Sequence, residues 1–287
     1  MNTVSIVGVG LIGGSFALAL RQHGFTGRII GVSSARSLAA ARQRGAIDEG
    51  LSLEEAIPAS DLIYLAQPIG RIIDVLPRVV QLARPQALIT DAGSTKAAIV
   101  ARAQSLLNRT GPFFLGGHPM AGKAERGVEF AEAGLFQGAT YVLTPKDGIL
   151  PAVEPVRVFC NWLEKLGSRT VVMDPEEHDH LVSFTSHLPQ MVSTALASLV
   201  LEEIRSSESW MVAGRGLRDM TRLARSAYEL WRDICMTNTH NIDRALSRYI
   251  QTLEHLRENL RSRALEEQFQ RGARFAAEFQ KKNQNVT

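Results

Sequence analysis

A glycine-rich turn near the start of the chain constrains the fold more than any other feature. The β-branched run Val4–Val7 leads directly into Gly8-Val9-Gly10-Leu11-Ile12-Gly13, and an apolar helical segment follows. In such a strand–turn–helix unit Gly8 permits the tight turn, Gly10 lets a pyrophosphate approach the backbone, and Gly13 lets the helix pack closely on the strand. The unpaired N–H groups and positive dipole at the helix start favour phosphate. The turn therefore predicts a dinucleotide site, in which two further residues contact the cofactor: Leu11 and Ile12.

The loop after the second expected strand bears on which dinucleotide binds. NAD-binding versions of this unit usually carry a carboxylate about twenty residues beyond the last glycine, where it accepts from the ribose 2′-hydroxyl. Ser33 stands at that distance, and Ser33, Ser34 and Arg36 together are donors suited to a 2′-phosphate. We therefore expect NADP, with NAD as the alternative. An ordinary polar loop whose serine caps a helix also fits these residues.

The first 174 residues alternate strand-like runs with helical patterns, whereas the rest of the chain is helical in pattern. Such alternation predicts a parallel sheet with helices on both faces. We expect an α/β fold, with a Rossmann-type dinucleotide-binding domain over residues 1–174 and an all-α domain over residues 175–287. The expected strands are Val4–Val7, Arg28–Val32, Leu62–Ala66, Ala87–Thr90, Phe113–Leu115, Tyr141–Thr144 and Thr170–Met173.

An apolar seam runs through the second half of the chain. Its members step by four and three, the spacing of a heptad repeat. Such a seam can pack inside one subunit or form a dimer interface, and the spacing alone does not separate the two. The seam consists of Ile242, Leu246, Tyr249, Leu253, Leu256 and Leu260.

Composition excludes several classes of function. With 287 residues, 45% of them hydrophobic, the chain can bury the cores of about two domains, and its net charge of +3 gives no general attraction for nucleic acid. No other run approaches the ~20 apolar residues of a membrane span, and the apolar start lacks the preceding basic residues of a signal peptide. Cys160 and Cys235 match no metal or redox spacing. We expect a cytoplasmic protein with reduced thiols, no metal, and no nucleic-acid or membrane partner.

Two loops that follow expected strands carry candidate chemical groups. Ser94 lies in Thr90–Lys96, where its hydroxyl could cap the next helix or face a ligand at the edge of the sheet. His118 lies in the glycine-rich segment Gly116–Gly122 and is stiffened by Pro119. An imidazole with a pKa near 6.5 suits proton removal at neutral pH, although a surface histidine would fit the same position.

The second half carries further histidines and a row of arginines. A metal site at His178 and His180 is disfavoured because residues two apart on a helix do not share a face. His180 and His187 do share one, so one of them could reach a cleft, while core or surface placement is the default for His178 and His180. The arginines line one helix face, either as a solvated basic surface or as a site for a carboxylate-rich substrate. They are Arg215, Arg218, Arg222 and Arg225.

Taken together, these segments resemble the prephenate/arogenate (cyclohexadienyl) dehydrogenase family of tyrosine biosynthesis. The matching segments occur in the family's order over roughly residues 4 to 280. They are Gly8–Gly13, Asp91–Lys96, Gly117–Gly122, Asp174–Asp179, Ser186–Pro189, Leu217–Arg222 and Leu230–Ile234. The resemblance implies oxidative decarboxylation of prephenate or arogenate with hydride transfer to NADP or NAD, and a homodimer formed through the C-terminal helices.

The resemblance also implies roles for individual residues. His118 takes the proton of the substrate's ring hydroxyl, and Ser94 orients that hydroxyl against the nicotinamide. Arg222 holds a substrate carboxylate, as an arginine can do with two parallel hydrogen bonds. The remaining implied contacts are His187, Trp231 and Arg218 on the substrate, and Gln67 and Pro68, together with Ser94, on the cofactor.

Two other functions compete with this one. A β-hydroxyacid dehydrogenase has a similar two-domain plan, but it requires a catalytic lysine on the first long helix after the Rossmann domain, and residues 176–205 contain no lysine. A non-catalytic NADP-binding module would bind the dinucleotide without turnover and would not need His118.

Overall fold

The computed structural model describes residues 1–123, 125–204 and 206–284, in which eight strands form one sheet. Their order is β3-β2-β1-β4-β5-β6-β7-β8, and it reverses direction between β1 and β4. A reversal of this kind opens a crevice for ligands at the carboxyl ends of the strands. The strands are β1 (Thr3–Val7), β2 (Arg28–Val32), β3 (Glu49–Gly50), β4 (Leu62–Leu65), β5 (Leu88–Asp91), β6 (Phe113–Pro119), β7 (Thr140–Thr144) and β8 (Arg169–Val172).

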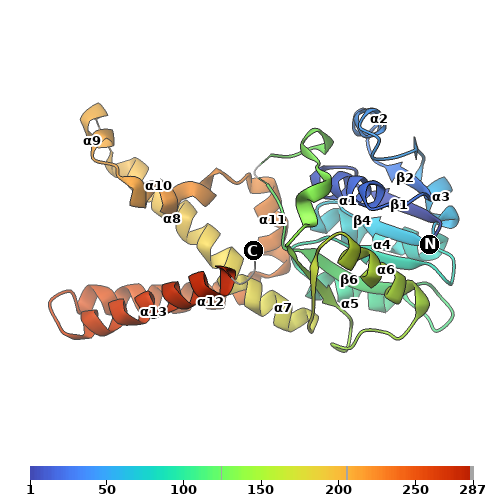
Figure 1. The fold of residues 1–287 in the computed structure, drawn as a ribbon. Coiled ribbons are helices and arrows are strands. Elements are labelled where there is room, and N and C mark those ends of the chain that lie inside the picture. The colour runs from blue at the N-terminus through green and yellow to red at the C-terminus, as the bar shows by residue number, and fades with distance from the viewer. Residues whose placement is uncertain (124, 205, 285–287) are drawn as a thin grey trace.

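Helices cover both faces of the sheet (Figure 1). One apolar cluster contains Phe16 of α1 and Phe159 of α6, and the other contains Leu76 of α4 and Ile99 of α5. This doubly wound arrangement confirms the expected α/β fold. The helices of this part are α1 (Leu11–Gln22), α2 (Ala35–Gln43), α3 (Leu53–Ala56), α4 (Ile69–Leu82), α5 (Ala97–Leu106) and α6 (Glu154–Lys165), with short 3₁₀ turns η1 (Ile57–Ala59), η2 (Val128–Phe130) and η3 (Ala133–Phe136).

The sheet departs from the expected parallel pairing at one place. β6 pairs with β5 in parallel through residues 113–115, but its later residues pair with β7 in antiparallel register. In the described part of the β6–β7 connection there are only the short turns η2 and η3, with no crossover helix. Parallel neighbours need a long crossover, so β7 runs the other way. The two-residue strand β3 was also not expected, because so short a run carries no periodicity.

The remainder of the chain is helical and begins directly after β8. Asp174 caps α7 by accepting hydrogen bonds from the backbone N–H groups of Glu176 and Glu177, and we propose this residue as the boundary between the two domains. In Figure 1, α8 to α10 and the pair α12–α13 extend away from the sheet. The helices are α7 (Pro175–Val182), α8 (Leu188–Glu203), α9 (Ser207–Met211), α10 (Arg215–Thr221), α11 (Tyr228–Thr237), α12 (Thr239–Glu258) and α13 (Ala264–Gln284), with a π-helical turn η4 (Ser183–His187) and a 3₁₀ turn η5 (Arg222–Arg225).

The heptad seam packs inside the chain over only part of its length. Ile242 is buried and Leu246 packs against the same cluster, whereas Leu253 and Leu260 are 46% and 65% exposed. The apolar surface continues on α13, where exposed aromatic side chains are Phe269, Phe275 and Phe279. Over the described ranges, no helix combines the length and the apolar character needed to cross a bilayer.

Candidate active site

Carboxylates from the helical part cap two of the helices that begin at the carboxyl edge of the sheet. Asp179 on α7 accepts from the backbone N–H groups of Lys96 (2.7 Å) and Ala97 (3.0 Å), at the start of α5. Asp233 on α11 accepts from Gly70 N at 3.0 Å, at the start of α4. In the part of the chain that the structure describes, no side chain caps α1. The first N–H groups of α1 therefore remain available to a bound anion.

The glycine-rich turn and its neighbours fit a dinucleotide. Gly8 has φ +98°, and a Cβ at Gly13 would lie 2.3 Å from the Gly8 carbonyl oxygen, so both positions require glycine. A Cβ at Gly10 would meet nothing within 4 Å, which leaves space for a pyrophosphate beside the helix start. The Oε1 atom of Gln67 is buried, and no group of the described residues donates to it. A ligand hydroxyl would satisfy this acceptor, as the expected cofactor role of Gln67 requires.

The residues after β2 divide into a helix cap and exposed donors. The Ser34 hydroxyl accepts from Ser37 N at 3.3 Å and caps α2, which is the structural role that this loop allowed. Ser33 and Arg36 are exposed, and the Arg36 guanidinium lies 3.9 Å from the Glu129 carboxylate. All three expected phosphate donors thus face solvent, and Ser34 also serves as the cap of α2. Pro68 occupies the N-cap position of α4, directly after Gln67.

A buried ion pair fixes the loop that carries Ser94. Asp91 and Lys96 are fully buried; the Lys96 ammonium donates to the Asp91 carboxylate and, at 2.7 Å, to the Gly117 carbonyl oxygen. Asp91 also accepts from Gly93 N and Gly117 N, so both of its carboxylate oxygens are hydrogen-bonded and the pair joins β5 to β6. Ser94 is half-buried and does not cap α5, because Asp179 does. Its hydroxyl has no protein partner within the described ranges.

Beside this ion pair, His118 is held by a chain of hydrogen bonds that begins in the helical part. His118 Nδ1 lies 2.8 Å from His178 Nε2, and His178 Nδ1 lies 2.8 Å from Asp179 Oδ1. Asp179 also accepts from two backbone N–H groups, as an ionised carboxylate does, so His178 Nδ1 carries the proton that is donated to it. When His178 is neutral, its Nε2 accepts from His118 Nδ1. This assignment leaves the lone pair of His118 on Nε2.

The surroundings keep His118 neutral at pH 7. Burial, followed by the neighbouring His178, Lys96 and His187, holds the pKa of the His118 imidazole well below its ordinary value of 6.5. A neutral imidazole with a free Nε2 can accept a proton. A general base oriented by a second group, which is itself oriented by a carboxylate, is a recurring catalytic arrangement.

His118 and His178, together with the nearby His187, are called the histidine cluster below. His187 and Trp231 lie together on its helical side. Their ring centroids are 5.8 Å apart in an edge-to-face arrangement. Asn238 Nδ2 lies 3.3 Å from His187 Nδ1 and donates to the Asp179 carbonyl oxygen at 2.8 Å, so His187 Nδ1 accepts and its Nε2 carries the proton. Burial lowers the pKa of His187 to about 4. The Trp231 Nε1–H is also buried without a partner among the described residues, which makes it a donor for a ligand.

The arginine row is exposed, as a solvated basic face or a site for a ligand anion would be. Arg218 lies on α10 and Arg222 begins η5, and neither guanidinium has a hydrogen-bond or salt-bridge partner among the residues described. His180 is not part of the histidine cluster; its ring packs against Phe184 instead, with centroids 5.4 Å apart. Within the described ranges no three or more His, Cys, Asp or Glu side chains are grouped to hold a metal ion.

Several residues of the site were not identified from their positions in the sequence. His178 was expected to be an ordinary core or surface histidine, and Lys96, Asp179, Asp233 and Asn238 were given no role. The helix start Asp174-Pro175-Glu176-Glu177-His178-Asp179 could have drawn attention to Asp179, since a second carboxylate inside a helix already capped by Asp174 is free to cap something else.

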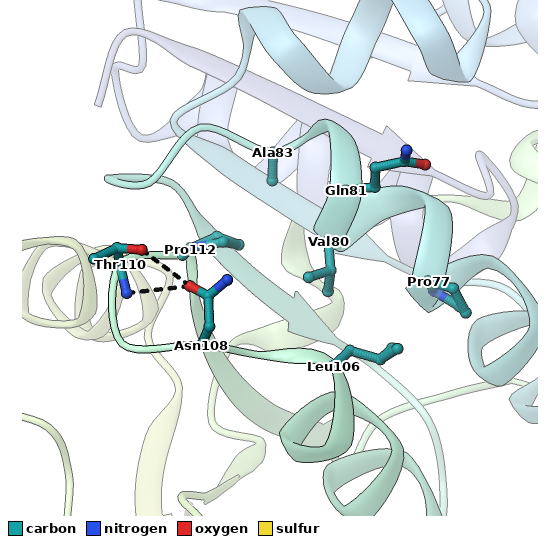
Figure 2. Close-up of a pocket in the computed structure, with 9 residues that line it drawn as sticks. Pro77, Val80, Gln81, Ala83, Leu106, Asn108, Thr110 and Pro112 are labelled. Carbon is teal, nitrogen blue, oxygen red and sulfur yellow. Dashed lines mark hydrogen bonds between the residues drawn. The ribbon is translucent and has the colours of Figure 1, made fainter.

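A separate cavity of about 340 Å³ lies at the opposite edge of the sheet (Figure 2). It is formed between the second half of α4 and the loop that precedes β6, and in that loop Asn108 Oδ1 accepts from the backbone N–H and the hydroxyl of Thr110. None of the expected site residues line it.

Two family models cover most of the chain. Residues 16–172 match the nucleotide-binding domain of prephenate dehydrogenase, and residues 174–274 match the prephenate dehydrogenase dimerization domain. The chain belongs to the prephenate dehydrogenase family. This membership confirms the family that the sequence motifs indicated.

Named members of the prephenate dehydrogenase family agree with this assignment. A prephenate dehydrogenase of Bacillus subtilis (strain 168) is 36% identical over 255 residues, which are 86% of this chain and 66% of the relative, so the chain spans about two thirds of that protein's length. The crystal structure of prephenate dehydrogenase from A. aeolicus in complex with hydroxyphenyl propionate and NAD⁺ has a TM-score of 0.83 at 31% identity, covering 100% of this chain and 99% of that one. Synechocystis arogenate dehydrogenase has a TM-score of 0.76 at 30% identity, covering 99% and 100%.

Proposed function

We propose that this protein catalyses the oxidative decarboxylation of prephenate, arogenate or both, with hydride transfer to NADP or NAD, in tyrosine biosynthesis. The hydrogen-bond chain from Asp179 through His178 to His118 supports this function most directly, because with a neutral His178 it leaves Nε2 of His118, on β6, as a proton acceptor. β6 lies three strands from β1, and strands are about 4.8 Å apart, so His118 stands roughly 14 Å along the edge from Gly8. A dinucleotide bound at Gly8 can extend along this edge towards it.

The residues of the site divide the chemistry between them. A bound nicotinamide dinucleotide supplies the hydride acceptor. His118 Nε2 accepts the proton of the substrate's ring hydroxyl, and Ser94 donates a hydrogen bond that orients the hydroxyl oxygen. Asp179 and His178 stabilise the imidazolium that forms, as the third member of a catalytic triad does. Loss of the hydroxyl proton and of the hydride on the same ring carbon converts the hydroxyl into a ring ketone. That product is a vinylogous β-keto acid, so the electrons of the C–C bond to the carboxylate enter the ring as carbon dioxide leaves.

The substrate's carboxylates require cationic or N–H donors. Arg222 offers a planar pair of N–H groups to one carboxylate, and Arg218 adds positive charge one helical turn earlier. His187 Nε2–H and Trp231 Nε1–H are donors that lie together beside the histidine cluster. These four residues form the substrate site that we propose.

NADP is the cofactor that we propose, with NAD as the alternative. Ser33 and Arg36 support NADP because both are exposed donors at the position where NAD-binding proteins usually place a carboxylate. The relative from A. aeolicus was solved with NAD⁺. We also propose that the protein acts in the cytoplasm as a homodimer, with the exposed apolar faces of α12 and α13 in the interface.

The test combines both substrates with both cofactors. Purified protein should reduce NADP when prephenate or arogenate is added, and should release one carbon dioxide per reduced nucleotide. A non-catalytic binding module would bind the dinucleotide without turnover, and a β-hydroxyacid dehydrogenase would oxidise hydroxyacids without releasing carbon dioxide from these substrates. Either result would replace the proposed activity.

A further inference from the structure

One peptide group in the arginine-bearing turn η5 is held at both ends by side chains of α8. Gln190 Nε2 donates to the Leu223 carbonyl oxygen at 2.9 Å, and Ser193 Oγ accepts from the Ala224 backbone N–H at 3.1 Å. That oxygen and that N–H belong to the same peptide bond. A donor and an acceptor at its two ends fix the orientation of the peptide plane.

The two clamping side chains are buried and oriented. Gln190 and Ser193 are 4% and 2% exposed, and they lie three positions apart on one face of α8. The amide of Gln190 must present its NH₂ to Leu223, because the flipped amide would place two carbonyl oxygens against each other. The same nitrogen lies 3.1 Å from the Thr194 hydroxyl, which holds the side chain in this rotamer.

The clamp acts next to Arg222, the residue before Leu223. The Arg222 guanidinium is exposed, and no partner in the described residues orients it. The backbone of η5 therefore sets the position and direction of its Cα–Cβ bond. α8 follows η4 directly, and η4 ends at His187. Gln190 and Ser193 therefore join the arginine to the helix that begins directly after His187, one of the proposed substrate-binding residues.

We propose that Gln190 and Ser193 are positioning residues, which set the geometry with which Arg222 holds the substrate carboxylate. This inference rests on the function proposed above. The same hydrogen bonds also satisfy buried polar groups, so a purely structural role would lower stability without a specific effect on substrate binding. The test must therefore show that the effect passes through Arg222.

The experiment is a double-mutant cycle between the clamp and the arginine. Gln190→Leu and Ser193→Ala should each raise the KM for the substrate by roughly tenfold, the effect of losing one buried hydrogen bond. The value of kcat and the Kd of the dinucleotide should stay within about twofold. In an Arg222→Ala background, which itself raises KM, neither substitution should raise it further.

Two controls complete the design. Ser193→Thr keeps the hydroxyl, so its KM should stay close to that of the wild type. Ser60→Ala removes a buried hydroxyl that donates to Ala56, far from the site, and should lower Tm with KM unchanged. Ser193→Ala removes only one oxygen atom, so it keeps the inference testable if Gln190→Leu does not fold.

The outcomes separate this inference from the function on which it rests. Equal increases in KM with and without Arg222 would overturn the positioning role, as would an unchanged KM in both single variants. A wild-type protein that turns over neither prephenate nor arogenate would instead overturn the proposed function.

Discussion

His118 and His178 are joined by a 2.8 Å hydrogen bond between Nδ1 and Nε2, although they lie 60 positions apart in the chain. His118 belongs to the sheet and His178 to the first helix of the all-α part. The bond therefore makes the candidate base dependent on how the two parts dock. Asp179 strengthens this dependence, because one carboxylate orients His178 and caps α5 beneath the Ser94 loop.

Replacing His118 with asparagine should abolish most turnover and leave cofactor binding intact. The amide cannot accept the hydroxyl proton, and positioned acid–base catalysis contributes about a hundred- to ten-thousand-fold. Steady-state kcat and the Kd of the dinucleotide from fluorescence titration measure the two effects. Normal turnover in the variant would show that another group is the base.

Asp179→Asn should lower kcat by about a hundredfold, because the amide can present an N–H to His178 and so disturb the tautomer of His118. The loss of the α5 cap should also lower Tm. His180→Ala is the matched control, since His180 lies on the same helix but packs against Phe184. A Tm change in Asp179→Asn with unchanged kcat would limit Asp179 to a structural role.

The acid limb of kcat/KM should lie below pH 6.5, because burial lowers the pKa of His118 and the base must be neutral to act. A limb at or above pH 6.5 that disappears in His118→Asn would show that the imidazole is solvated.

Stability should fall as the pH drops below about 6.5. Burial holds the pKa values of both His118 and His187 below those of the unfolded chain, His187 at about 4, so the unfolded state binds more protons in this range. The stabilisation is fully present above the unfolded pKa and decreases by about 1.4 kcal/mol per pH unit for each histidine. Urea denaturation at several pH values measures this dependence. The free energy of unfolding should change less per pH unit in His118→Asn than in the wild type. Equal slopes would contradict the burial of a neutral His118.

Ser33→Asp should shift cofactor preference towards NAD by about tenfold or more, because the added carboxylate repels a 2′-phosphate and can accept from a 2′-hydroxyl. Ser60→Ala is the control: it removes a buried hydroxyl that donates to the Ala56 carbonyl oxygen and should cost about 1 kcal/mol of stability without changing preference. The ratio of kcat/KM for NADP to that for NAD measures both. An unchanged ratio in Ser33→Asp would place the discriminating contacts elsewhere.

Local pattern was sufficient for much of the fold. The run Arg28–Val32 matches β2 at both ends, and the expected strand Leu62–Ala66 corresponds closely to β4. Pattern was insufficient for the antiparallel pair β6–β7, because the expected parallel direction needs a crossover helix and the described part of the β6–β7 connection has only the turns η2 and η3. It also offered Ser94 as a possible cap of α5. The cap is Asp179, which accepts from the backbone N–H of Lys96, 83 positions earlier in the chain.

The sequence by itself determined the glycine-rich turn and the change from an α/β part to an all-α part, because both depend on backbone geometry and periodicity over a few neighbouring residues. It placed His118 in a loop after a strand that ends at Leu115, whereas β6 continues to Pro119 because residues 116–119 pair with β7, so His118 lies within the strand. Only the tertiary structure decided which nitrogen of His118 bonds to His178, which carboxylate caps α5, and which side chains hold the peptide after Arg222. Those features need groups from distant segments within about 3 Å of each other, and such distances arise only when the helical part docks on the sheet.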